Sequence, residues 1–124
     1  ETLLTPTRIY VKPVLELLKE VDVHGMAHIT GGGIVENLSR VLPEGLGAVI
    51  DTSAIEIPAI FELIASLGQV RRDEMYRTFN MGIGFILVVG SADAERTLVK
   101  MGQQGEKPQI IGKVSREAEG VKLL

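Results

Sequence analysis

The chain has 124 residues, of which 45% are hydrophobic and 23% charged, values that predict one globular domain with a core of its own. Its formal net charge of −3 at pH 7 provides no basic surface for nucleic acid, and no apolar run approaches the roughly 20 residues of a membrane span. The absence of cysteine excludes disulfides and thiolate chemistry, and we expect a cytoplasmic protein.

The first part of the chain is predicted to be an irregular lead-in followed by a helix. Pro6 favours an extended conformation at Thr5, so residues 1–9 are expected to lack regular structure. Helical spacing predicts a helix from about Tyr10 to Val21. Its expected buried stripe contains Val14, Leu15, Leu17, Leu18 and Val21. Arg8 stands apart from other charges, and we expect it to form a surface salt bridge rather than to act in chemistry.

Three consecutive glycines form the most informative stretch. A strand is predicted from Gly25 to Ile29, and a helix ending near Leu42 follows Gly31-Gly32-Gly33. Glycine lets the backbone adopt positive φ and approach a ligand closely, and unpaired N–H groups before the helix suit a phosphate or another oxyanion. The sequence matches neither standard nucleotide-binding glycine motif. A second interpretation therefore remains open, in which the glycines serve only tight packing of a strand-to-helix turn.

The two histidines belong to the predicted strand that precedes the glycines. His24 and His28 are four residues apart and leave the same face roughly 13 Å from each other, too far to share a metal. His28 is next to the glycines, so it could donate to a ligand oxyanion or act as an acid or base. Capping of strand-end backbone groups is the alternative.

A second unusual stretch lies in the middle of the chain. A strand over residues 46–50 precedes a helix that is predicted from Pro58 to Gly68, and a short charged helical turn follows over residues 71–77. Arg77, Thr78 and Asn80 are good oxyanion partners. They precede Gly82, Gly84 and an apolar run over residues 83–89 that is typical of a strand buried on both faces. This stretch is either part of a site at a strand end or a polar turn before a core strand.

The last part of the chain predicts one helix and two strands. Ser91 is expected to cap a helix that ends near Met101, and strands are expected over residues 109–114 and 120–124. Helices and strands thus alternate along the whole chain. The order predicts a layered α/β (α+β) domain with a mixed β-sheet and helices packed mainly on one face.

Three motifs in the same order resemble those of a known family. They are Leu4-Thr5-Pro6-Thr7-Arg8-Ile9-Tyr10-Val11-Lys12, the stretch from His24 through Arg40, and Glu74-Met75-Tyr76-Arg77-Thr78-Phe79-Asn80-Met81-Gly82-Ile83-Gly84. Together they resemble the C-terminal domain of AIR synthetase, the phosphoribosylformylglycinamidine cyclo-ligase of purine biosynthesis. The likeness covers nearly the whole chain, so residues 1–124 are expected to form this domain. A first residue of Glu1 instead of Met, and a family domain that begins some tens of residues earlier, predict an N-terminally truncated piece of a two-domain enzyme.

The resemblance implies an ATP-dependent ring closure. Formylglycinamidine ribonucleotide (FGAM) and ATP would give aminoimidazole ribonucleotide, ADP and phosphate, with magnesium on the nucleotide. The formyl oxygen is phosphorylated, and the amidine nitrogen then attacks the activated carbon, chemistry that depends on positioning and charge neutralisation. In this family the N-terminal domain forms the homodimer and most of the ATP and Mg²⁺ site. We therefore expect the present chain alone to be inactive.

The resemblance also assigns expected roles to particular residues. Thr30, Gly31, Gly32 and Gly33 would hold a phosphate, that of FGAM or of ATP, and Asn37 would orient the substrate or the loop. Further contacts are expected from Arg77 and Thr78, and the candidates for catalysis are His28 and Asn80; no metal ligand is expected in this chain. Two alternatives remain: a stand-alone ligand-binding or assembly module, and another ATP-using enzyme of the same superfamily with a different acceptor.

Overall fold

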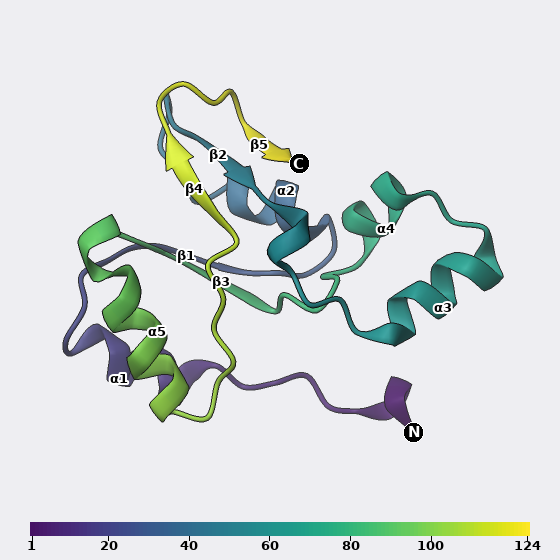
Figure 1. The fold of residues 1–124 in the computed structure, drawn as a ribbon, viewed down its shortest axis with the longest axis horizontal. Helices are drawn as coiled ribbons and strands as arrows, with labels where there is room; N and C mark the ends of the chain where they lie inside the picture. The colour runs from purple at the N-terminus through teal and green to yellow at the C-terminus, as the bar shows by residue number, and fades with distance from the viewer.

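The computed structural model describes all 124 residues, and helices and strands alternate along most of the chain (Figure 1). The elements are α1 (Val11–Leu18), β1 (Val23–His28), α2 (Gly33–Ser39), β2 (Gly47–Ile50), α3 (Ala59–Gly68), α4 (Arg72–Thr78), β3 (Phe85–Val89), α5 (Ala94–Gln103), β4 (Gly112–Ser115) and β5 (Val121–Leu123). Short 3-10 turns cover Thr2–Leu4, Thr52–Ala54 and Ser91–Asp93. Each predicted helix and strand is present, with ends that differ by a few residues.

The strands form two sheets, and together with the helices they confirm the expected α/β class. β1 and β3 are antiparallel and pair His28 with Phe85 at one end. The other sheet has the order β4-β2-β5 and is mixed, because β2 runs antiparallel to β4 and parallel to β5. The division into two ladders was not predicted, since local patterns identify strands but not their partners.

Two hydrophobic clusters hold these layers together. The larger one joins α2, β2, α4 and the β1–β3 ladder around Ile34, Leu38, Ile50 and Met75. The smaller one packs α1 and α5 against the ladder through Leu17, Val21 and Met101. In Figure 1 these two helices lie together at one end of the molecule, and α3 and α4 lie at the other.

Several expectations of burial were wrong. Leu15 and Leu18 of α1 are exposed, because α1 meets only α5 and the ladder and buries a narrower stripe than the sequence suggested. Helical spacing would also bury the apolar residues of α3, but this helix has no fully buried residue: Phe61 and Ile64 are partly buried against the larger cluster, and Leu63 and Leu67 face solvent. Ser91 does not cap a helix: it begins the 3-10 turn, and Asp93 occupies the N-cap position of α5.

β3 also differs from the strand buried on both faces that its apolar sequence predicts. Within Phe85–Val89 only Ile86 is buried, and the other four residues are half-buried. The reason is that β3 has a single neighbouring strand, β1, and borders a cavity on its other side. The longest helices have ten residues, and none has the length and apolar character required to cross a bilayer.

Candidate functional site

The glycine loop, defined here as residues 30–33, connects the end of β1 to the start of α2. Gly32 and Gly33 have φ values of 97° and 66°, a region that favours glycine. A Cβ on Gly33 would overlap the carbonyl of Tyr76 at the end of α4, and one on Gly32 would overlap the Glu36 carboxylate. Gly31 has open space around it. Tight packing therefore explains Gly33, as the second interpretation proposed, but it does not explain Gly31.

Asn37 holds the glycine loop from inside the protein. Its side chain is buried, and its amide nitrogen lies 3.1, 3.2 and 2.8 Å from the carbonyl oxygens of Thr30, Gly31 and Gly33. The Thr30 hydroxyl donates to the Asn37 side-chain oxygen at 3.3 Å. Asn37 thus orients the loop and turns three of its carbonyls inward.

This arrangement determines where the N–H groups of the loop point. All peptide bonds are trans, so each N–H lies opposite the carbonyl of the preceding residue. Because the carbonyls of Thr30 and Gly31 face Asn37, the N–H groups of Gly31 and Gly32 point away from it. Neither N–H donates to another backbone group of the chain. Two adjacent free donors on an exposed glycine turn are the features of an anion-binding nest.

The structure brings the second polar stretch, residues 77–84, next to the glycine loop. The Ile29 N–H donates to the Gly84 carbonyl at 2.9 Å, and the site of a Cβ on Gly33 lies 3.4 Å from the Phe79 carbonyl oxygen. Arg77 is largely exposed and is 3.8 Å from Glu74. The backbone of this stretch therefore lies beside the glycine loop and not at a remote strand end.

Two of these polar side chains also have local structural partners. The Thr78 hydroxyl donates to Glu74 at 3.4 Å, and the Asn80 side-chain oxygen accepts the N–H of Gly82 at 2.9 Å. The latter bond closes the turn into β3, where Met81 and Gly82 both have positive φ. Asn80 retains a free side-chain NH₂, and the long ion pair leaves the Arg77 guanidinium available to a ligand.

Three neighbouring rings, those of His28, Tyr10 and Phe85, lie at the end of β1 that leads into the glycine loop. The exposed ring of His28 lies 6.0 Å from that of Tyr10 and 6.2 Å from that of Phe85, measured between centroids. The Tyr10 hydroxyl occupies the space that a Cβ on Gly84 would need. Burial raises the pKa of Tyr10, and the carboxylate of Glu106 acts in the same direction. The His28 ring therefore packs beside aromatic rings and does not serve as a strand-end cap.

Sequence reasoning missed two neighbours of the site. Glu36 places a carboxylate over Gly32 and pairs with Arg40, so a negative group with its own cation borders the loop. The sequence could have indicated this contact, because Glu36 follows Gly32 by four positions and residues four apart lie on the same face of a helix. The packing of Tyr10 on Gly84 had no local signal. The expected Arg8 salt bridge is confirmed, with Nε 2.9 Å from Glu106.

No group of three or more His, Asp or Glu side chains is placed to hold a metal ion in this chain. His24 and His28 lie on one face of β1; His24 has one carboxylate nearby, with Asp22 Oδ2 3.4 Å from its Nε2, and this pair does not reach a group of three. The donors that gather at the candidate site are backbone N–H groups, hydroxyls, amides and a guanidinium, which are partners for an anion.

The chain belongs to the family of AIR synthase related proteins, as their C-terminal domain, whose family model matches residues 1–123. It is 52% identical over all 124 residues to a phosphoribosylformylglycinamidine cyclo-ligase of Desulfitobacterium hafniense, of which it covers 37%. It is 51% identical over 121 residues to the enzyme of that name from Pseudothermotoga lettingae, covering 98% of this chain and 36% of that protein. The chain thus spans little more than a third of the curated relatives it matches.

Solved structures support the fold. The crystal structure of Escherichia coli HypE, a hydrogenase maturation protein, superposes with a TM-score of 0.72 over 94% of this chain and 36% of that one. A second structure of E. coli HypE gives a TM-score of 0.70. The sequence identities are 21% and 22%, so these likenesses concern the fold alone.

Proposed function

We propose that this chain is the C-terminal part of an ATP-dependent cyclo-ligase that converts FGAM to aminoimidazole ribonucleotide, ADP and phosphate. The observation that carries this proposal is the 52% identity, over the full length of the chain, to a protein named phosphoribosylformylglycinamidine cyclo-ligase. The chain corresponds to just over a third of that protein. On the family resemblance, most of the ATP site and the homodimer contacts are assigned to the remaining part, and the chain alone is expected to be inactive.

In this proposal the glycine loop binds the phosphate of FGAM. The free N–H groups of Gly31 and Gly32 supply two adjacent donors, and the Thr30 hydroxyl lies beside them. α2 has only seven residues, so the donors of the loop, rather than a long helix dipole, favour the anion. The Glu36 carboxylate opposes an anion here, and its pairing with Arg40 reduces that repulsion.

The second loop contributes charge and polar contacts in the same proposal. Arg77 is the one guanidinium among the candidate residues, is exposed and would neutralise phosphate charge, with Thr78 as an additional donor. The free NH₂ of Asn80 would orient the substrate near the formyl group. His28 is assigned to proton transfer, because the amidine nitrogen of FGAM that attacks the activated carbon must lose a proton as phosphate leaves. An enzyme with His28→Ala that keeps full turnover would remove that role.

The reaction needs little covalent chemistry from the protein. The γ-phosphoryl group of ATP is transferred to the formyl oxygen of FGAM and ADP departs. The amidine nitrogen then bonds to the same carbon, the carbon–oxygen bond to phosphate breaks, and a proton is released. Residues of this chain would bind and orient the ribonucleotide and exclude water, which is a positioning role. Magnesium, when bound with ATP, would supply further neutralisation of phosphate charge.

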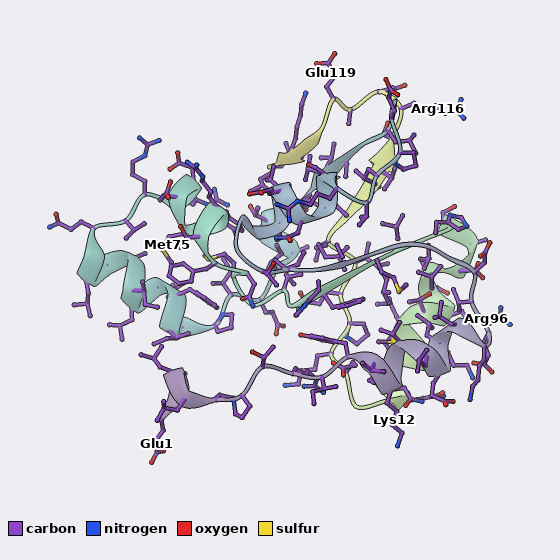
Figure 2. The ribbon with its side chains drawn as sticks, turned by 180° about the vertical axis from the view of Figure 1, so that it is seen from behind. Glu1, Lys12, Met75, Arg96, Arg116 and Glu119 are labelled. Carbon is purple, nitrogen blue, oxygen red and sulfur yellow. The ribbon has the colours of Figure 1, made fainter.

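The KM for FGAM of a full-length Arg77→Ala variant tests whether Arg77 contacts the substrate phosphate. Changing Arg77→Ala removes an exposed guanidinium whose only ion pair, to Glu74, is 3.8 Å long, so stability should change little. Loss of a charge-assisted contact to phosphate should raise KM for FGAM about tenfold or more. The matched control is Arg116→Ala, in the exposed turn between β4 and β5, which Figure 2 shows well apart from the labelled Met75 of α4. Equal KM values for the two variants would contradict the proposed role of Arg77.

The comparison of acceptors separates this function from its alternatives. The full-length protein should form aminoimidazole ribonucleotide from FGAM and ATP. Turnover with selenide or thiamine phosphate instead would indicate another enzyme of the same superfamily. Binding of ribose 5-phosphate without any turnover would indicate a ligand-binding module.

A further inference from the structure

Glu36 places a carboxylate directly against the glycine loop. This residue belongs to the first turn of α2, and its side chain lies over Gly32, in the space that a Cβ at that position would need. Oε1 of the carboxylate accepts a hydrogen bond from the Arg40 guanidinium. Oε2 is the atom nearest to the Cβ position of Gly32, and it takes part in no hydrogen bond or ion pair of the chain. Because 56% of the Glu36 side chain is exposed, Oε2 is open to a ligand in the loop.

This carboxylate is an unfavourable neighbour for a phosphate alone. The free N–H groups of Gly31 and Gly32 favour an anion, whereas the negative charge of Glu36 repels one. The ion pair with Arg40 weakens the repulsion, but it leaves Oε2 unused. The chain thus keeps a free acceptor at a place where phosphate binding requires donors. A ligand explains that acceptor if the group next to its phosphate is a hydrogen-bond donor.

The ribose of a ribonucleotide provides such donors. In FGAM the phosphate is esterified to the 5′-carbon, so the ribose hydroxyls are the nearest hydrogen-bond donors to the phosphate along the molecule. A hydrogen bond from a hydroxyl to a carboxylate is charge-assisted, and it is stronger than one to a neutral acceptor. In dinucleotide-binding folds a carboxylate accepts from a ribose hydroxyl while a glycine-rich turn holds the phosphate. Glu36 and the glycine loop place the same two kinds of group side by side.

We infer that Oε2 of Glu36 accepts a hydrogen bond from a ribose hydroxyl of the substrate and makes this site specific for a ribonucleotide. The inference rests on the proposed function, because it needs the phosphate of FGAM in the glycine loop. Arg40 holds the other oxygen, so the carboxylate stays over the loop with Oε2 free for the ligand. The repulsion of phosphate by Glu36 is offset only when the sugar is present. A phosphate without a ribose therefore gains nothing from Glu36.

Glu36→Ala in the full-length protein tests the inference, because it should change the affinities for phosphate and for FGAM in opposite directions. Methyl phosphate, a phosphate monoester without a sugar, should become a tighter competitive inhibitor against FGAM by about threefold, since a like charge is removed. KM for FGAM should rise about tenfold, since the charge-assisted contact is lost. The matched control is Glu119→Ala, which removes the same charge from the exposed turn between β4 and β5 (Figure 2). It should leave both values within about twofold of the parent.

Deoxy analogues of FGAM identify the group that Glu36 contacts. In the parent enzyme the 2′-deoxy or the 3′-deoxy analogue should have a kcat/KM about tenfold or more below that of FGAM. The Glu36→Ala variant should use that analogue and FGAM with kcat/KM values within about twofold of each other, because the acceptor is gone.

The inference is overturned if the parent enzyme uses FGAM and both deoxy analogues equally well. It is also overturned if Glu36→Ala keeps the full preference for FGAM, since another residue would then contact the ribose. An equal loss of affinity for methyl phosphate and for FGAM would show that Glu36 only shapes the loop. Each of these results, obtained with an enzyme that turns FGAM over, leaves the proposed function in place. A full-length protein that does not act on FGAM would contradict the proposed function itself, and the inference with it.

Discussion

Gly33→Ala is expected to destabilise the chain by about 3 kcal/mol, the largest effect of any single methyl group in the glycine loop. The residue has a φ of 66°, which costs an L-residue energy by itself. Its new Cβ would also overlap the Tyr76 carbonyl, so α2 and α4 would have to move apart. Denaturant unfolding of the variant and of the unmodified chain measures the difference in free energy.

Gly31→Ala is the matched control for this change. Gly31 has no atom within 4 Å of an added Cβ and does not have positive φ, so its stability should stay within about 0.5 kcal/mol of the parent. In the full-length enzyme the same methyl group would project toward the proposed phosphate, and KM for FGAM should rise. Equal destabilisation by the two alanines would contradict the packing role of Gly33.

Asn37→Asp is expected to lower the free energy of unfolding by about 3 kcal/mol at neutral pH. The amide of Asn37 is the donor to three carbonyls of the glycine loop, and a carboxylate can donate to none of them. It would place a buried negative charge against carbonyl oxygens. Part of the loss should be recovered as the pH falls and the new carboxyl is protonated, which unfolding curves at several pH values would detect.

Asn80→Asp provides the control for the same chemical change. The Asn80 side chain uses its oxygen as an acceptor from the Gly82 N–H, and a carboxylate keeps that acceptor. Stability should therefore change by no more than about 0.5 kcal/mol. A small effect of Asn37→Asp, similar to that of Asn80→Asp, would show that Asn37 does not hold the loop.

The sequence predicted the elements well because their signals are local. Helical spacing, Pro58 and Gly68 defined the helices, and apolar runs defined the strands. The division of the strands into two ladders depends on pairings between distant residues, such as β2 with β5, and no local pattern encodes them. The exposure of Leu63 and the half-burial of β3 likewise depend on what packs against them.

The glycine loop shows where sequence reasoning reaches its limit. Both interpretations of the three glycines describe part of the structure, since Gly33 is required by packing and Gly31 is not. The sequence could name Asn37, but only the fold shows its amide facing the carbonyls of the loop. The contact of Gly33 with the carbonyls of Tyr76 and Phe79, on either side of Arg77, joins residues more than 40 positions apart, and no local pattern encodes it.

A crystal structure of the full-length protein with FGAM, without ATP, tests the central claim most directly. We expect the ribonucleotide phosphate to lie within hydrogen-bond distance of the Gly31 and Gly32 N–H groups, with Asn37 still bound to the carbonyls behind them. A phosphate bound elsewhere, with the N–H groups of the loop contacting only solvent or protein, would contradict it.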